Sequence, residues 1–147
     1  MVRTAKASWE GNLKDGHGKI SVESELFKDA AYSFSRRFEN EKGTNPEELL
    51  AAAHAGCFSM ALSAGISGAG FNVLSIVTQD NVILDKVEGG FAISKIEINT
   101  EADIVGIDEA TFNKIAEDTK KNCPVSKALK GVEFILNAKL KSAAAKV

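Results

Sequence analysis

Residues 44–62, TNPEELLAAAHAGCFSMAL, combine a helix start with an apolar run that carries a cysteine. The Asn45 side chain can cap the helix, Pro46 fits the first helical position, and Glu48 completes a capping box. From Leu49 onward the run is apolar on nearly all sides, which is the pattern of a buried helix. We therefore predict a buried helix that begins at Asn45 and ends in the glycine-rich stretch SAGISGAG.

The cysteine of this run, Cys57, cannot touch Glu47 within one helix, because the two lie roughly 15 Å apart along the helix axis and on different faces. If two copies of the helix cross antiparallel about a two-fold axis near Ala52, Glu47 of one copy lies level with Cys57 of the other. The residues on either side of this axis, Ala51 and Ala53, are small and would let the helices approach closely. The sequence thus predicts Glu47 beside the partner's Cys57 in a homodimer.

The composition is typical of one globular domain. The chain has 147 residues, 44% hydrophobic and 26% charged, with a net charge of -2, so it can bury its own core and has no basic cluster. No apolar run approaches the about 20 residues free of polar groups that a bilayer span needs. Residues 1–12 lack the apolar segment of a secretory signal. We expect a single domain over residues 1–147, cytoplasmic, with no nucleic-acid and no membrane partner.

Hydrophobic periodicity predicts an α+β order of three strands, a helix, two strands, two helices and a strand. The strands are expected at residues 3–10, around Ile20 and Val22, from Tyr32 to Phe38, at 72–84 and 91–102 joined by a turn at 86–90, and at 132–140. A phase change between Ile93 and Ile96 indicates a β-bulge. Asp108 caps the second helix, and the third opens at Cys123 and stops at Gly131.

The two cysteines, Cys57 and Cys123, have neither the spacing of a zinc site nor that of a thioredoxin-type pair. A structural disulfide is not expected in the cytoplasm, and no metal-ligand or cofactor-binding motif occurs in the chain, so we predict no metal and no cofactor. Cys123 stands at a helix entrance, where free N–H groups and the helix dipole favour thiolate over thiol. Two unreactive buried thiols remain the alternative.

Cys57 lies in mid-helix, where apolar surroundings disfavour thiolate unless a cation is supplied from elsewhere. Arg37 or Arg36 can supply it, because a guanidinium is always charged and can hold a thiolate and a carboxylate such as Glu47 together. Such a triad would make Cys57 a strong nucleophile. The plainer alternatives are that Glu47 only offsets the helix dipole and that the arginines lie at a solvated strand end.

His54 lies one helical turn before Cys57, so a Cys–His hydrolase or transferase site is a further hypothesis. No Asp or Asn is evidently placed to orient the imidazole ring. A lone histidine on a buried helix more often packs than catalyses.

Four stretches of the chain together resemble the OsmC/Ohr family, the osmotically inducible protein C and organic hydroperoxide resistance proteins. They are WEG at 9–11, RFENEKGTNPEELLAAAHAGCFSMAL at 37–62, LDKVEGGFAISKI at 84–96 and NCPVSKAL at 122–129. The resemblance covers nearly the whole chain, and its second and fourth stretches are specific. The residues in these stretches are more similar to those of the OsmC branch than to those of Ohr.

This resemblance implies an α+β subunit of order β3-α-β2-α2-β with a mixed sheet, in an intertwined homodimer with a central buried helix and two active sites at the interface. It also implies a thiol-dependent peroxidase that reduces organic hydroperoxides. The family's peroxidatic cysteine falls on Cys57 and its resolving cysteine on Cys123, and the two form a disulfide during the reaction. The glutamate falls on Glu47 and the arginine on Arg37, with the adjacent Arg36 as the alternative.

The resemblance further implies a dithiol reductant, dihydrolipoamide on a lipoylated partner protein, and a role in oxidative or osmotic stress resistance. The apolar residues around Cys57 favour an alkyl hydroperoxide over hydrogen peroxide. A non-enzymatic dimeric stress protein that binds a hydrophobic ligand, with idle thiols, is the alternative function. The joint presence of Cys57, Cys123, Glu47 and Arg37 favours the peroxidase, because a scaffold has no need of all four.

Overall fold

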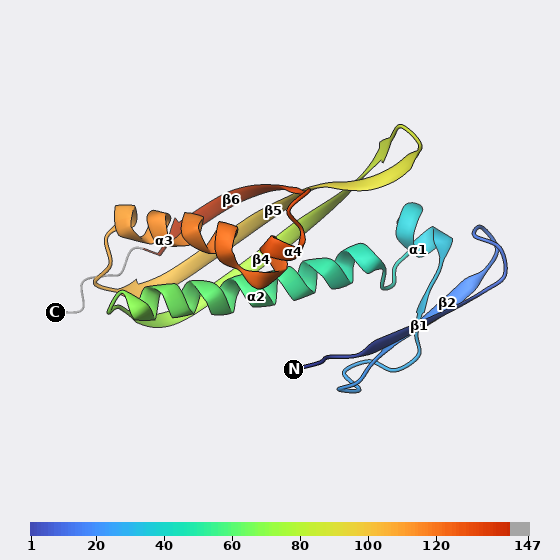
Figure 1. Cartoon of the computed structure of the whole chain (residues 1–147), viewed down its shortest axis with the longest axis horizontal. Helices are drawn as coiled ribbons and strands as arrows, with labels where there is room; N and C mark the ends of the chain where they lie inside the picture. The colour runs from blue at the N-terminus through green and yellow to red at the C-terminus, as the bar shows by residue number, and fades with distance from the viewer. Residues whose placement is uncertain (142–147) are drawn as a thin grey trace. The chain divides into compact units, whose positions relative to one another are not determined.

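The computed structural model describes residues 1–141 (Figure 1). The chain divides into two units, Met1–Leu49 and Leu50–Val147, and each is described by itself. The boundary lies inside one continuous helix, α2 (Pro46–Gly68). The single domain over residues 1–147 stays a prediction.

The first unit is built on a three-stranded antiparallel sheet of order β1-β2-β3. Its strands are β1 (Ala5–Glu10), β2 (His17–Val22) and β3 (Ala30–Tyr32). The rings of Trp9 and Tyr32 lie 5.4 Å apart between their centroids, and the Tyr32 hydroxyl donates to the Ser8 carbonyl. The predicted hairpin of the first two strands is confirmed.

The predicted third strand is wrong beyond Tyr32, because a short helix, α1 (Phe34–Phe38), begins there. The Ser33 side chain caps it by accepting a hydrogen bond from the Arg36 N–H. The rings of Phe34 and Phe38 lie 4.9 Å apart between their centroids, tilted by 44°. Residues four apart share a face both in a strand and in a helix, so the alternation of aromatics did not distinguish the two.

The second unit contains a mixed sheet of order β4-β5-β6. Its strands are β4 (Asn72–Val87), β5 (Gly90–Val105) and β6 (Glu133–Leu140). The pair β4–β5 is antiparallel and the pair β5–β6 is parallel. The predicted bulge is confirmed, since Leu84 pairs with Ile93 and Ile83 with Lys95, which leaves Ser94 without a partner in the register.

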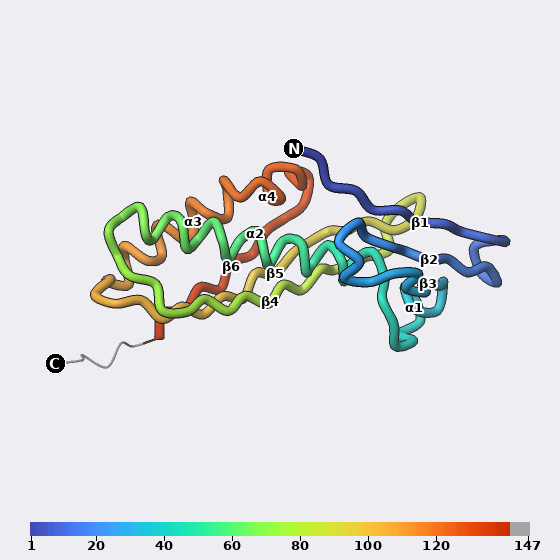
Figure 2. The backbone as a smooth tube through the Cα atoms, turned by 90° about the horizontal axis from the view of Figure 1, so that it is seen from below, coloured from blue at the N-terminus to red at the C-terminus, as the bar shows by residue number. Residues whose placement is uncertain are grey.

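The core of this unit lies between one face of the sheet and two helices, α2 and α3 (Glu109–Asn122) (Figures 1 and 2). Every second residue of β5 is buried from Ile96 to Ile104, while the residues between them are polar. Against this face pack Phe58, Leu62 and Ile66 of α2 and Phe112 and Ala116 of α3. The helices therefore cover one face of the sheet, as strict alternation requires.

The ends of the helices follow their capping residues. The Asn45 side chain accepts from the Glu48 N–H at 2.8 Å at the start of α2, and Asp108 caps α3 through the Thr111 N–H. The last helix, α4 (Pro124–Ala128), begins after Cys123 with proline at its first position. The α+β class and the predicted element order are confirmed, with α1 as one additional helix.

Only one stripe of α2 is buried in the single chain. Besides Glu47 in the first turn of the helix, it consists of His54, Phe58, Leu62 and Ile66, spaced four residues apart. On another face, Met60 is 77% exposed. The prediction of a helix buried on all sides is therefore wrong for the single chain, because one sheet can cover only one face of a helix.

By length and composition α2 is long and apolar enough to cross a membrane, although it is not free of polar groups, since it holds His54, Ser59 and Ser63. The core helix of a soluble protein passes the same test. Within α2, the His54 ring contacts two polar side chains of its own unit. The absence of a membrane partner stays a prediction.

Candidate functional site

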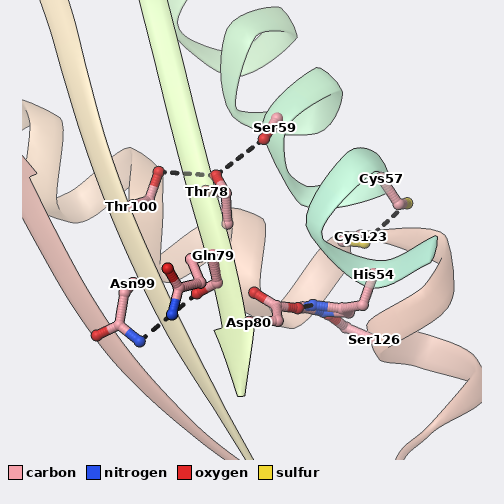
Figure 3. Close-up of polar contacts among 10 residues, drawn as sticks. All are labelled: His54, Cys57, Ser59, Thr78, Gln79, Asp80, Asn99, Thr100, Cys123 and Ser126. Carbon is pink, nitrogen blue, oxygen red and sulfur yellow. Dashed lines mark hydrogen bonds and ion pairs between the residues drawn. The ribbon is translucent and has the colours of Figure 1, made fainter. Parts of the chain in front are cut away.

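The two cysteines meet in the second unit. Cys57 lies on α2 and is half-buried, whereas Cys123 precedes α4 and is buried. Both are free thiols, and the Cys123 thiol donates to the Cys57 sulfur across 2.8 Å (Figure 3). A disulfide needs sulfurs about 2.05 Å apart, so an approach of less than about 1 Å would bond them. The geometry suits a pair that alternates between two thiols and a disulfide.

The surroundings of Cys57 work against its ionisation. Burial raises the pKa of the Cys57 thiol above its ordinary value, and the adjacent Cys123 thiol adds to the rise. The backbone N–H of Val125 lowers this pKa by hydrogen bonding to the sulfur. Among the described residues, none of these contributions comes from a cation. Cys57 therefore needs a positive charge from elsewhere to react as a thiolate at neutral pH.

Cys123 stands at the entrance of α4, as the sequence predicts, and the expected preference of its sulfur for thiolate stays a prediction. Its side chain makes no cap hydrogen bond with α4, and it points at Cys57 instead (Figure 3). The N–H of Val125, in the first turn of α4, serves the Cys57 sulfur. The N–H groups at the start of α4 were expected to favour the thiolate of Cys123, but one of them bonds to Cys57 instead.

Arg37 and Glu47 form an ion pair within the first unit. Arg37 Nη2 lies 2.8 Å from Glu47 Oε1, and Arg37 Nε donates to both carboxylate oxygens at 3.1 and 3.3 Å. The Glu47 side chain is 11% exposed and that of Arg37 is 38% exposed. Among residues 1–141, no hydrogen bond of Arg37 Nη1 is found. One guanidinium therefore holds the carboxylate and keeps a donor available for a second anion.

Arg36 is engaged differently. Its Nη1 donates to the Ala31 carbonyl at 2.7 Å, and its Nε lies 3.5 Å from Glu41. Both arginines lie on α1 rather than on a strand end. Of the two arginines that the sequence left open, the structure pairs Arg37 with Glu47.

His54 does not pair with Cys57. Its Nδ1 contacts the carboxylate of Asp80 on β4, and its Nε2 lies 2.8 Å from the Ser126 hydroxyl on α4 (Figure 3). Its ring stacks on Phe134 at 5.1 Å between centroids. The expectation that no acidic residue orients this ring is wrong, because Asp80 does so. With both nitrogens occupied, His54 has no free nitrogen to act as the base of a Cys–His hydrolase.

Sequence reasoning missed Asp80 and Ser126. The signal for Asp80 was present, since it shares the parity of Ile76 and Val82, which pack toward the core, and an acid on that face requires a buried partner. Ser126 lies one helical turn after Cys123, but a single serine in a short helix carries no such signal.

A cavity of ≈ 330 Å³ reaches Cys123 between α2 and α3. It is lined by Ala61, Gly65, Ile115, Asp118, Thr119, Asn122 and Cys123. Among the described residues no group of three or more His, Cys, Asp or Glu side chains is arranged to hold a metal ion. The absence of a metal and of a cofactor stays a prediction.

The model of the OsmC-like protein family matches residues 39–137, which include both cysteines and Glu47. The chain belongs to this family. It is 51% identical to Peroxiredoxin OsmC of Escherichia coli over 140 residues, which cover 95% of this chain and 97% of the relative.

Solved structures of OsmC-like proteins have the same fold. The organic hydroperoxide resistance protein OhrB of Bacillus subtilis superposes with a TM-score of 0.65 at 28% identity, covering 94% of this chain and 98% of that one. An organic hydroperoxide resistance protein OsmC from Legionella pneumophila gives a TM-score of 0.67 at 27% identity, covering 92% and 96%.

The contact between the sulfurs predicts that mild oxidation closes a disulfide within one chain. Treating the reduced protein with diamide should bond Cys57 to Cys123, because the sulfurs lie 2.8 Å apart. Peptide mass spectrometry under non-reducing conditions identifies the bonded pair. Cys123→Ser should form no intrachain disulfide, and a wild-type product linked between chains would contradict the geometry.

Proposed function

We propose that this OsmC-like chain is a thiol-dependent peroxidase that reduces organic hydroperoxides to alcohols, with Cys57 as the peroxidatic and Cys123 as the resolving cysteine. The observation that carries the proposal is the contact of two free thiols at 2.8 Å. The names of the relatives support it, since one is a peroxiredoxin and others are organic hydroperoxide resistance proteins. The apolar residues near Cys57 in sequence, Phe58 and the exposed Met60, favour an alkyl peroxide.

The reaction has two steps on the chain. The Cys57 thiolate attacks the terminal oxygen of the peroxide, which carries the hydrogen, the O–O bond breaks, and the alkoxide takes a proton and leaves as an alcohol, which makes Cys57 a sulfenic acid. The Cys123 sulfur then attacks the Cys57 sulfur. The S–O bond breaks, and the hydroxide leaves as water with the proton of Cys123. The product is the Cys57–Cys123 disulfide.

A dithiol then completes the cycle by thiol–disulfide exchange and becomes a disulfide itself. We place the protein in the cytoplasm, where the reductant is a lipoyl-type dithiol on a partner protein and the physiological role is resistance to oxidative or osmotic stress. The cavity that reaches Cys123 gives a slender dithiol arm a route to the buried sulfur.

The Arg37–Glu47 pair supplies the charge that Cys57 lacks. Glu47 fixes the guanidinium through three hydrogen bonds, and the remaining donor of Arg37 stabilises the thiolate and the developing charge on the peroxide. We assign this contact to a homodimer, in which Arg37 and Glu47 of one subunit serve the partner's Cys57.

The exposed side of α2 supports this homodimer. Ala52, Ala53, Gly56, Met60 and Ala64 lie on it and are exposed in the single chain. They are apolar and mostly small, so a second copy of the helix can approach closely and remove them from water. A crossing near Ala52 brings Glu47 level with the partner's Cys57.

Replacing each cysteine separates the two steps. With one equivalent of cumene hydroperoxide under anaerobic conditions, the wild type should consume the peroxide rapidly and form the intrachain disulfide. Cys57→Ser should not react, and Cys123→Ser should accumulate oxidised Cys57. Stopped-flow kinetics and intact-mass spectrometry check this. Slow oxidation that is equal at both thiols would overturn the peroxidase and favour the ligand-binding alternative. Turnover of hydrogen peroxide at a rate comparable to that of cumene hydroperoxide would overturn only the preference for organic peroxides.

Removing the charge of Arg37 should slow the first step. In Arg37→Gln we expect a loss of about 100-fold or more at neutral pH, because a charged donor near the reacting atoms is lost. The pKa of the Cys57 thiol then stays raised by burial, so the thiolate forms only at higher pH and the rate should recover as the pH increases. Stopped-flow rates across a pH series measure this. Arg36→Gln is the matched control, and an equal loss there would contradict the assignment to Arg37.

Mixed dimers test which subunit serves which cysteine. Arg37→Gln and Cys57→Ser chains are each expected to be inactive as homodimers. When both are co-expressed, random pairing should restore about a quarter of the wild-type sites, since each heterodimer keeps one intact arginine opposite one intact cysteine. Active-site titration of the purified mixture measures the fraction. No recovery in isolated heterodimers would show that Arg37 acts within its own chain.

A further inference from the structure

A second contact joins the helices of the two cysteines. His54 Nε2 lies 2.8 Å from the Ser126 hydroxyl, next to the Cys57–Cys123 contact of the same length (Figure 3). His54 lies three residues before Cys57 on α2, and Ser126 lies three residues after Cys123 on α4. Residues three apart are neighbours on a helix surface. The polar contact and the sulfur contact are therefore parallel links between the same two segments.

Ser126 gives α4 a buried side-chain contact with α2. It is the buried residue of this five-residue helix, with 4% exposure. A helix this short is not stable by itself, so its position depends on its contacts. The buried side chain is a hydroxyl rather than an apolar group, and its partner is His54. Moving α4 away from His54 would leave two buried polar groups without partners, which costs free energy.

Asp80 fixes the other end of the contact. Its carboxylate meets His54 Nδ1, and both side chains are fully buried. A carboxylate only accepts hydrogen bonds, so Nδ1 donates to Asp80, and Nε2 at the other side of the ring faces the Ser126 hydroxyl. The stacked ring of Phe134 holds the imidazole plane. The orientation of His54 is thus set by contacts with β4 and β6 that do not involve α4.

The order Asp–His–Ser is also that of a hydrolase triad, but burial argues against this use. The His54 side chain is fully buried and Ser126 is 4% exposed, so no substrate carbonyl reaches the serine hydroxyl in this structure. The contact between His54 and Ser126 instead bears on the position of α4, the helix that carries Ser126.

We propose that His54, oriented by Asp80, is a positioning residue that holds α4 through Ser126 and thereby sets how fast Cys123 closes the disulfide on oxidised Cys57. The inference rests on the proposed function. When Cys57 gains an oxygen, the thiol contact at 2.8 Å is disturbed, but the His54–Ser126 contact involves neither sulfur. It keeps Cys123 within reach while the sulfenic acid exists, and so keeps that acid from meeting a second peroxide and becoming a sulfinic acid.

Ser126→Ala tests this with the smallest change, because it removes only the hydroxyl. We expect disulfide closure to slow by about 10- to 100-fold, the scale on which small misplacements of reacting groups reduce rates. Single-turnover stopped-flow with dimedone trapping measures the lifetime of the sulfenic acid. Mass spectrometry over a peroxide series measures the fraction of sulfinic acid, which should rise at lower peroxide than in the wild type.

Ser59→Ala is the matched control. Ser59 is on α2 and donates to Thr78 of β4 at 2.8 Å, and within residues 1–141 no hydrogen bond joins its side chain to α4. It should therefore lose comparable stability without slowing closure. His54→Gln provides a second variant that breaks the orientation by Asp80, and it should resemble Ser126→Ala in both readouts.

The outcomes are separable. Wild-type closure rates in both Ser126→Ala and His54→Gln would overturn the positioning role and leave the peroxidase intact. Equal slowing in Ser59→Ala would also overturn it, since any loss of stability would then suffice. A wild type that forms no disulfide with peroxide would overturn the proposed function and this inference together.

Discussion

The packing of one stripe of α2 on the sheet is the constraint on which the second unit depends. His54, Phe58, Leu62 and Ile66 recur every four residues and are fully buried, so the rotation of the helix about its axis is fixed. Cys57 comes directly before Phe58, and it is therefore only half-buried at the edge of the stripe. The burial of the stripe fixes the rotation of α2 about its axis, and this rotation sets both the exposure of Cys57 and its position relative to Cys123.

This placement of Cys57 has two opposing effects on its thiol. A half-buried cysteine beside apolar side chains is shielded from bulk water, but burial raises the pKa of the Cys57 thiol, and the Val125 N–H offsets the effect only in part. A nearby cation would lower the pKa of the Cys57 thiol, and a guanidinium is suited to this because it stays charged even where it is partly buried. The Glu47 carboxylate keeps that guanidinium in one orientation, so the two groups act as a unit rather than as a surface ion pair of small effect.

Much of this arrangement was predictable from sequence because it rests on local rules. The Asn45 and Asp108 caps and the Ser94 bulge follow from side-chain chemistry and from a change of phase, and each needs only neighbouring residues. The α1 helix was not predictable from alternation, since Phe34 and Phe38 fit both periods. The Asp80–His54–Ser126 group joins three elements that are far apart in sequence, and only the tertiary fold shows that the partners of the ring are a carboxylate and a hydroxyl.

The two faces of α2 explain why its sequence is apolar on nearly all sides. One face needs large side chains to fill the space against β5, and it has Phe58, Leu62 and Ile66. The other carries small residues from Ala52 to Ala64, which bury little area against their own chain. Small side chains bring two helix backbones close together, so this face suits the helix pairing of the proposed homodimer. The buried face of α2 fixes the position of Cys57 at its edge, and in the proposed homodimer the open face would set the approach of a second copy. One segment of sequence then meets both requirements of the proposed site.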